Sequence, residues 1–241
     1  ASQSGQRAVP SDATRRQSPQ TIAPQARQRA VAGRSGCRAQ SGPASPTLLL
    51  LALLLAAAGL LLVFLNPLTR WLAPIAMALA ALYPFAKRFI HIPQAILGIA
   101  FGWGTIMAWT ATRNTVEPQA WIVFAATVVW AIAYDTIYAV QDQEDDRRIG
   151  VKSSALLFGS ALWIAVGLAL GTMLVLLVLA GRLAEIGWAY YLALGAVGIF
   201  FAVQSAALRN RVDPPQAFRM FQAHVWAGAA ILAGLVAGFL L

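Results

Sequence analysis

Charged residues are scarce in this chain, and their scarcity indicates its class. Only 11% of the 241 residues are charged and 59% are hydrophobic, whereas a soluble domain of this length carries about 25% charged residues. The apolar residues gather into long uncharged runs, and a run of about 20 residues spans the hydrocarbon core of a bilayer. Because that core holds no water to satisfy backbone groups, each run must be a helix. The sequence therefore predicts an all-α, polytopic transmembrane helical bundle.

Acidic residues and cysteine are rarer still, and each shortage excludes a class of function. Nine Asp and Glu stand against 18 Lys and Arg. A basic excess often indicates nucleic-acid binding, but a chain buried in lipid has little surface to offer, so we expect the bilayer and no nucleic acid as its partner. The lone Cys37 cannot form an internal disulfide, and nothing around it supplies a base for a nucleophile.

Seven candidate spans follow one another along the chain, separated by short polar connections. They are Thr47–Leu65, Trp71–Phe85, Gln94–Thr112, Gln119–Ala139, Ala155–Ala180, Gly187–Leu208 and Gln222–Leu241. Alternate connections hold eight Lys or Arg on one side and three on the other. The positive-inside rule therefore predicts that the basic connections, Lys87–Pro93, Gln141–Ser154 and Arg209–Phe221, are cytoplasmic.

The first 46 residues have a different composition from the rest. They contain no Leu, Phe, Tyr, Trp, Lys or Glu, and seven Arg. Such a segment buries too little apolar surface to offset its ordering entropy, so we expect it to be disordered. It is a flexible cytoplasmic tail, an organellar transit peptide, which is also rich in Arg and Ser, or out-of-frame sequence from a GC-rich gene.

The residues with the clearest chemistry stand at the end of the fourth span. If that span continues as a helix, Asp135, Tyr138, Asp142 and Asp145 or Asp146 recur at steps of three or four residues and share one face. Like charges one turn apart are unfavourable unless a cation neutralises them. Mg²⁺ prefers oxygen ligands and takes one or two carboxylates, with waters and substrate phosphates completing its shell. The pattern predicts a magnesium site, with Gly150 ending the helix and Lys152 returning a positive charge.

A solvated, charged loop is the alternative interpretation of residues 141–152. For Glu144, Arg147 and Arg148 the two interpretations stand at even odds. Asp135 is different, because it lies inside an apolar segment, where an ionisable side chain is unfavourable and is a functional candidate by default.

Two stretches of the chain carry a resemblance to a known family. The run Tyr134–Ala155 resembles the second aspartate-rich motif of the UbiA superfamily of intramembrane prenyltransferases. Tyr83–Arg88, followed by Pro93-Gln94 and Gly98–Trp103, resembles its 4-hydroxybenzoate branch in particular. The resemblance covers Leu48–Leu241.

The resemblance implies roles for particular residues. Asp142 and Asp146 would hold Mg²⁺ on an allylic diphosphate, and Asp135 and Tyr138 would line the cavity. Lys87, Arg88 and Lys152 would contact the diphosphate. In the mechanism so implied, the rings of Tyr138, Phe101 or Trp103 face an allylic cation.

The activity so implied is transfer of a polyprenyl group from polyprenyl diphosphate to the ring of 4-hydroxybenzoate in ubiquinone biosynthesis. We expect this in the bacterial inner membrane, or in the mitochondrial inner membrane as the alternative. Rival interpretations are a catalytically inert membrane remnant and a small transporter. A transporter would tend to show inverted repeats or matched broken helices, and the sequence shows neither.

The sequence also departs from the family pattern. The family has nine helices and a first aspartate-rich motif after its second helix, and no such motif occurs in these residues. We therefore expect residues 47–241 to form a prenyltransferase domain without the first two helices, and its activity to be impaired. A frameshift or a misassigned start would explain both this and the foreign composition of residues 1–46.

Small residues and histidines elsewhere call for structural interpretations. The pairs Gly98/Gly102, Gly167/Gly171 and Gly234/Gly238 have the small-xxx-small spacing of close helix contacts. His91 lies in a basic connection and His224 at a predicted helix start, without a second ligand at metal spacing, so we expect both to be structural or exposed.

Overall fold

The computed structural model describes residues 44–90, 92–150, 152–210 and 212–241. Two compact units, Ala1–Leu55 and Ala56–Leu241, meet within the first described helix. The described part of the first unit lies wholly in that helix, α2, which spans Ala44–Val63. Residues 1–43 of the segment predicted to be disordered lie outside the described residues. In the described part of the second unit, all regular structure is helical.

Each of the seven predicted spans corresponds to a long helix. After α2, the long helices are α3 (Pro67–Phe89), α4 (Pro93–Arg113), α5 (Pro118–Tyr138), α8 (Leu162–Leu183), α9 (Trp188–Ala207) and α10 (Pro214–Leu240). Short helices α6 (Gln143–Ile149) and α7 (Ser154–Phe158) and the 3₁₀ turn η1 (Gly159–Ala161) lie between α5 and α8. Four of the long helices begin with proline, whose fixed φ and missing N–H suit the first helical turn.

Two of the predicted boundaries are wrong. The fifth span is not one helix, because the chain bends at Gly159, which adopts φ 48°, a conformation that glycine reaches at no steric cost. The seventh helix begins at Pro214, eight residues before the predicted start at Gln222. There the Asp213 side chain caps the helix by accepting a hydrogen bond from the Gln216 amide at 3.0 Å.

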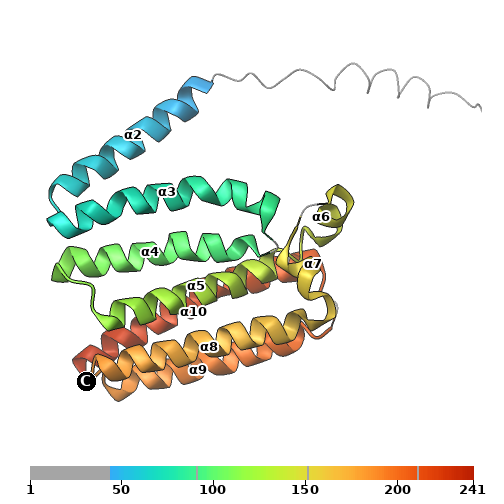
Figure 1. Ribbon diagram of the computed structural model, residues 1–241. Helices are drawn as coiled ribbons and strands as arrows, with labels where there is room; N and C mark the ends of the chain where they lie inside the picture. The colour runs from blue at the N-terminus through green and yellow to red at the C-terminus, as the bar shows by residue number, and fades with distance from the viewer. Residues whose placement is uncertain (1–43, 91, 151, 211) are drawn as a thin grey trace, which may run out of the picture. The chain divides into compact units, whose positions relative to one another are not determined.

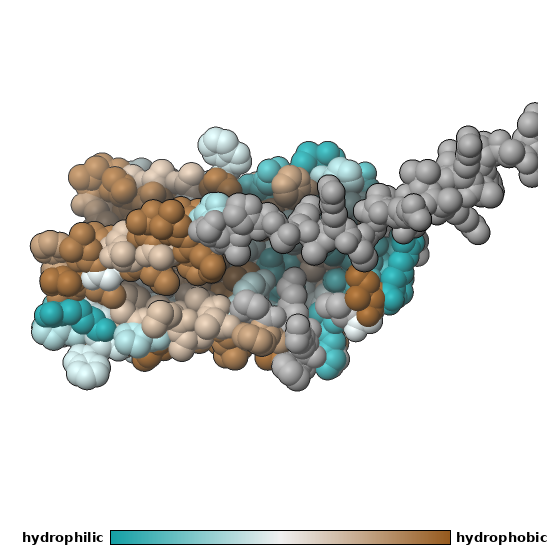
Figure 2. Space-filling view, turned by 90° about the horizontal axis from the view of Figure 1, so that it is seen from above, coloured by the Kyte–Doolittle hydropathy of each residue, from teal (hydrophilic) through white to brown (hydrophobic). Residues whose placement is uncertain are grey.

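The protein is a multi-pass membrane protein. Six of its described helices or helix pairs are long and apolar enough to cross a membrane, and α3 is not among them. The span predicted at Trp71–Phe85 is therefore confirmed as a helix but not as a membrane-spanning one. Apolar side chains such as Ile199 and Val225 are 70% and 71% exposed. On the visible face in Figure 2, hydrophobic side chains cover the lengths of the helices and hydrophilic ones gather at the ends.

Helices α5, α8, α9 and α10 form a closed ring in which each packs against two others. Helix α4 packs on α5 outside this ring, and α3 packs on α4 (Figure 1). The ring encloses several of the largest buried apolar side chains, among them Ile137, Leu170, Met173 and Phe201, each at most 2% exposed. We call these four helices the closed ring.

Small residues set the closest helix contacts, as predicted. A Cβ added at Gly98 would lie 2.7 Å from the Val128 carbonyl oxygen, so α4 and α5 touch through their backbones. Gly102, Gly234 and Gly238 are equally crowded by neighbouring helices. In the remaining pair only Gly167 is close to a neighbour, Ser205, whereas Gly171 faces open space. The helix-contact prediction thus holds for five of the six glycines.

Candidate active site

The predicted aspartate-rich segment lies at one end of the helices, where α5 ends and α6 and α7 follow (Figure 1). Asp135 is half-buried in the last turn of α5, and Tyr138 is its final residue, 37% exposed. Asp142 occupies the N-cap of α6, and Asp145 and Asp146 lie in its first turn. We call Asp142–Asp146 the acidic turn.

The prediction that the α5 helix continues to the acidic turn is wrong. Residues 139–142 form a turn. Hydrogen bonds between residues three apart tighten it, from the Val140 amide to the Ile137 carbonyl and from the Gln141 amide to the Tyr138 carbonyl. One continuous face therefore does not carry all of the acidic residues. Asp142 and Asp146 nevertheless remain one turn apart, because the Asp146 amide donates to the Asp142 carbonyl at 2.8 Å.

Side chains from the next segment hold this turn against α5. The buried hydroxyls of Thr136 in α5 and Ser154 in α7 are hydrogen-bonded at 2.9 Å. The Gln143 amide in α6 donates to the Ala155 carbonyl in α7 at 3.0 Å. Together the two bonds link α6 to α7 and α7 to α5, so the chain after the turn lies against the end of α5. Gly150 ends α6 with φ 77°, as predicted.

The charges of α6 lie mostly on the surface. Arg148 pairs with Glu144 and, at 3.8 Å, with Asp145, and the three side chains are 69–76% exposed. Exposed ion pairs of this kind contribute little to stability. For Glu144 and Arg148 this geometry favours the solvated interpretation over a ligand-binding one.

The acidic turn fits a shared metal site rather than one formed by the protein alone. Among the described residues, no three acidic, His or Cys side chains come together closely enough to hold an ion. Asp142 and Asp146 offer two carboxylates one turn apart. That is the number Mg²⁺ takes from a protein when waters and substrate phosphates supply the rest of its shell. The donor set therefore fits Mg²⁺ bound together with a phosphate-bearing substrate.

The basic side chains predicted to bind diphosphate are only partly described. Lys87 and Arg88 fall in the last turn of α3, and their side chains lie outside the described part of the structure, as does His91. Lys152 is half-buried in the short link between α6 and α7, next to Ser153, whose hydroxyl caps α7. Lys152 thus stands ten residues beyond Asp142, on the segment that returns to α5.

Two tyrosine side chains that the sequence did not connect with Asp135 lie near its carboxylate. Its carboxylate lies within electrostatic range of the phenols of Tyr83 on α3 and Tyr134 on α5. In the sequence, Tyr83 stood out only as part of the run Tyr83–Arg88 that carries the resemblance. The structure therefore adds two phenols to the surroundings of the acid inside the apolar segment.

A stripe of aromatic rings runs along the seam between α5 and α10, inward from Tyr138. The Tyr138 and Phe221 ring centroids are 5.0 Å apart, and Phe221 and Tyr134 follow at 5.8 Å. Tyr134 in turn lies 5.9 Å from His224. Tyr138 is thus part of an aromatic wall beside the acidic turn.

The other two rings proposed for the cation lie elsewhere. Phe101 is 62% exposed. The Trp103 indole donates to the Leu72 carbonyl at 3.1 Å and packs edge-on against Trp121, in the first turn of α5. Trp121 and Asp135 are 14 residues apart, or about 21 Å along the helix. Of the three predicted rings, only Tyr138 adjoins the candidate site.

His224 was expected to be either structural or exposed, and it is structural. It is buried in the interior of α10. Its Nδ1 accepts a hydrogen bond from the Trp130 indole at 2.8 Å, so its Nε2 carries the proton and donates to Gln204 Oε1 at 2.8 Å. The Gln204 amide then donates to the Met220 carbonyl at 2.8 Å. We call Trp130, His224, Gln204 and Met220 the polar string. A histidine and glutamine within apolar segments were the only sequence signals for it.

Comparison with known proteins supplies the wider context. The UbiA prenyltransferase family pattern matches residues 40–240. A 4-hydroxybenzoate octaprenyltransferase from Pseudomonas aeruginosa is 46% identical over 176 residues, which cover 73% of this chain and 59% of that protein. One from Alkalilimnicola ehrlichii is 46% identical over 188 residues, covering 78% and 64% respectively. The chain thus spans about three fifths of the length of these relatives.

A solved structure shares the fold. The apo structure of a UbiA homologue from Aeropyrum pernix K1 superposes with a TM-score of 0.61 at 22% sequence identity. The match covers 73% of this chain and 66% of that one. The arrangement of helices described above is therefore an arrangement already seen in a UbiA homologue.

Proposed function

The chain belongs to the UbiA prenyltransferase family, and from this membership we propose that it carries the main part of a 4-hydroxybenzoate polyprenyltransferase. Its donor would be a polyprenyl diphosphate, its acceptor 4-hydroxybenzoate, and its place the bacterial inner membrane. The observation that carries the proposal is the acidic turn, with two carboxylates one helical turn apart, next to the half-buried Asp135.

The proposed reaction breaks the allylic C–O bond of the donor, and the bonding electron pair leaves with the diphosphate. The ring carbon ortho to the phenol of 4-hydroxybenzoate then forms the new C–C bond and loses its proton. Mg²⁺ bound between the acidic turn and the diphosphate would stabilise the charge that develops on the leaving group. In this assignment Asp142 and Asp146 are the protein ligands.

The chain's own residues would do the rest of the work. Lys152, and with it Lys87 and Arg88, would bind the diphosphate oxygens. Tyr138 and Phe221, with ring centroids 5.0 Å apart, offer aromatic faces next to the acidic turn, and such faces attract a cation. The exposed apolar side chains along the helices let the polyprenyl tail remain in lipid while its diphosphate meets the acidic turn.

Product formation in membranes tests the proposal. Because the chain spans about three fifths of its relatives' length, residues 47–241 would be fused behind the first two helices and first aspartate-rich motif of the Pseudomonas aeruginosa relative, the parts that the family resemblance implies are missing here. Membranes holding this fusion, and membranes holding the chain alone, would receive 4-hydroxybenzoate, a polyprenyl diphosphate and Mg²⁺. We expect prenylated 4-hydroxybenzoate from the fusion, and its loss when EDTA replaces Mg²⁺. Correctly inserted fusion protein that forms no product would favour an inert remnant.

A further inference from the structure

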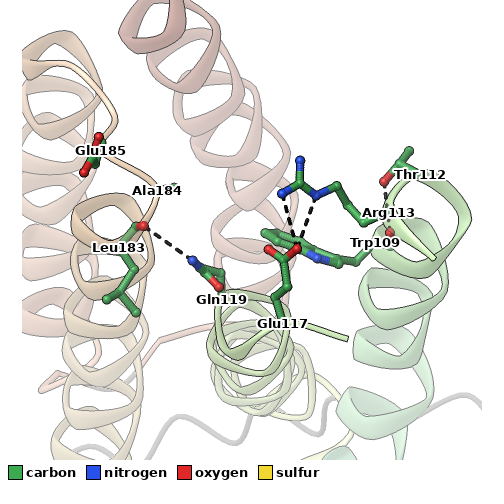
Figure 3. A pocket seen from close by; sticks show the side chains of 8 residues that line it. All are labelled: Trp109, Thr112, Arg113, Glu117, Gln119, Leu183, Ala184 and Glu185. Carbon is green, nitrogen blue, oxygen red and sulfur yellow. Dashed lines mark hydrogen bonds and ion pairs between the residues drawn. The ribbon is translucent and has the colours of Figure 1, made fainter. Parts of the chain in front are cut away.

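A cavity opens at the end of the helices opposite the acidic turn (Figure 3). It has a volume of about 470 Å³ and is lined by the end of α4, the start of α5 and the end of α8. A water molecule takes about 30 Å³ in the liquid, so the space exceeds what a few bridging waters fill. The proposed prenyl transfer makes no use of this end of the molecule.

Two buried polar atoms of the cavity's lining residues have no hydrogen-bond partner. In the described part of the chain three buried side-chain atoms are unpaired, and two of them, Trp109 Nε1 and Gln119 Oε1, belong to this lining. The Gln119 amide nitrogen donates to the Leu183 carbonyl at 3.4 Å, which fixes the oxygen as the free atom. An unpaired buried polar group is unfavourable. Both atoms are closed to solvent in this structure, so their side chains would turn toward the cavity to pair with a ligand. One unpaired donor and one unpaired acceptor then suit a ligand that both accepts and donates hydrogen bonds.

The charges around the cavity point to the same kind of ligand. The Arg113 guanidinium donates two hydrogen bonds, of 3.3 and 3.2 Å, to one oxygen of Glu117, and its other nitrogen remains available (Figure 3). Glu185 lies across the opening and forms no ion pair with any residue the structure describes. An acceptor group would be favoured next to Arg113 and Trp109, and a cationic donor next to Glu185.

The surroundings of the cavity are those of a lipid. Helices α4, α5 and α8 all qualify as membrane spans, so the cavity at their ends lies at the depth of lipid headgroups. Below it, Leu179 and Leu183 are 45% and 47% exposed along α8, and Trp121 is 47% exposed on α5. Such side chains contact acyl chains, and tryptophan is enriched at this depth.

We propose that this cavity binds the headgroup of a zwitterionic phospholipid that carries a primary ammonium, as phosphatidylethanolamine does. Its phosphate accepts from Trp109 Nε1 and Arg113, and its ammonium donates to Glu185 and Gln119 Oε1. Phosphatidylcholine has the same charges but no N–H to donate. Phosphatidylglycerol has no cation to place against Glu185. The site therefore discriminates among three lipids that share a glycerol phosphate.

Native mass spectrometry of the full chain, released from vesicles of equal parts of the three lipids, tests the proposal. We expect phosphatidylethanolamine to remain bound in preference to the other two. Glu185→Gln removes the exposed carboxylate without disturbing a buried contact, and should reduce that preference about tenfold. The matched control is Glu144→Gln at the opposite end, which should leave the preference unchanged. Equal retention of all three lipids, or equal effects of the two substitutions, would overturn the proposal.

Two further measurements keep the assignment specific. Trp109→Phe keeps the ring but removes the unpaired N–H, and should lower retention of phosphatidylethanolamine in a variant whose thermal unfolding matches that of the parent. Soluble phosphoethanolamine carries the same headgroup chemistry without acyl chains. If it displaces the lipid at equal concentration, the cavity is a site for a free solute and the lipid assignment is wrong.

Discussion

The closed ring and the acidic turn differ in how much of their geometry the protein itself determines. The ring surrounds Ile137, Leu170, Met173 and Phe201, and the polar string that crosses it leaves no ring nitrogen of His224 unpaired. Helix α6, by contrast, contains no buried residue, and its charges pair with one another on the surface. The first region is complete without any ligand, whereas the second has carboxylates whose mutual repulsion a ligand would relieve.

This difference fits a division of labour within the family's fold. In the proposed function, the closed ring would offer the apolar surface for the polyprenyl tail, because its packing needs no ligand. The acidic turn is attached to the closed ring through α7. The Gln143–Ala155 hydrogen bond joins the turn to α7, and the Thr136–Ser154 hydrogen bond joins α7 to α5. Substitutions in the ring should therefore lower stability, and substitutions in the acidic turn should lower activity and leave stability nearly unchanged.

The largest expected effect comes from removing a side chain that the ring encloses. Phe201→Ala deletes a phenyl group that is 2% exposed and contacts both Trp130 and His224. Large-to-small substitutions of buried Phe destabilise a protein by about 3–5 kcal/mol. Denaturant unfolding in detergent micelles measures this. Phe200→Ala is the matched control, since the neighbouring ring is 37% exposed. Equal destabilisation by the two substitutions would show that the closed ring of helices has no distinct core.

Asp142→Asn in the fusion protein should have the next largest effect, on activity alone. It keeps the size of the side chain but removes one negative charge from the proposed Mg²⁺ site. We expect kcat to fall by about 10²–10³-fold, the effect of losing one group that stabilises transition-state charge. Prenylation of 4-hydroxybenzoate in membranes, measured across a range of Mg²⁺ concentrations, gives the result. Near-normal turnover at low Mg²⁺ would remove Asp142 from the site.

Breaking the polar string should destabilise the ring by a smaller amount. Gln204→Leu leaves the Nε2–H of the buried His224 without an acceptor, at an expected loss of about 1–3 kcal/mol. Thr127→Val serves as the control, because the Thr127 hydroxyl bonds only within its own helix, to the Val123 carbonyl. Thermal unfolding of both variants measures whether the polar string stabilises the protein: a stabilising string predicts a lower melting temperature for Gln204→Leu than for Thr127→Val. An unchanged melting temperature for Gln204→Leu would rule the string out as a stabilising element.

Ser154→Ala should loosen the attachment of the acidic turn rather than the ring. It removes the hydrogen bond between two buried hydroxyls, worth about 1 kcal/mol. Amide hydrogen exchange should rise across residues 139–158 and stay unchanged in α8 and α9. The exposed Ser160 offers the control substitution Ser160→Ala. A uniform rise across all helices would show that the turn and the ring unfold as one unit.

The smallest expected effect is that of Glu144→Gln. Its side chain is 76% exposed and paired only with Arg148, and exposed pairs contribute about 0–1 kcal/mol. Both turnover of the fusion protein and stability should be close to those of the parent. A loss in turnover larger than that of Asp142→Asn would mean that the metal faces the other side of α6.

The sequence predicted the long helices well because membrane spans are encoded locally. An uncharged apolar run must be helical in lipid whatever surrounds it. The prolines at helix starts were not used in the prediction, and the spans predicted to begin at Trp71 and Gln222 begin earlier, at Pro67 and Pro214. The kind of residue at the candidate site was predictable for the same reason. Asp135 stands out against its own apolar segment without reference to any other part of the chain.

The end of α5 was not predictable from the residues around it, whereas the bend at Gly159 has a local cause in that glycine. Nothing near Tyr138 ends α5, and the turn that follows is held by Ser154, 18 residues after its partner Thr136. His224 was assigned to a helix start because the predicted span began at Gln222 rather than Pro214. Its structural role could not be inferred locally either, because its partners Trp130 and Gln204 lie 94 and 20 residues away. Tyr83 approaches Asp135 only because α3, α4 and α5 pack side by side.

The polar string also has a consequence for how the protein is made. Membrane proteins are synthesised from the amino terminus, and helices enter the bilayer as they emerge. Helix α5 therefore arrives with the Trp130 indole unpaired, and stays so while α8 and α9 are added, since its acceptor is on α10. The Trp130–His224 contact, which joins α5 to α10 and completes the closed ring, links residues 94 positions apart, so we expect it to form slowly during folding. If translation stopped before α10, the surfaces of α5 and α9 that pack against α10 would stay uncovered, and we expect quality-control proteases to act on such a chain.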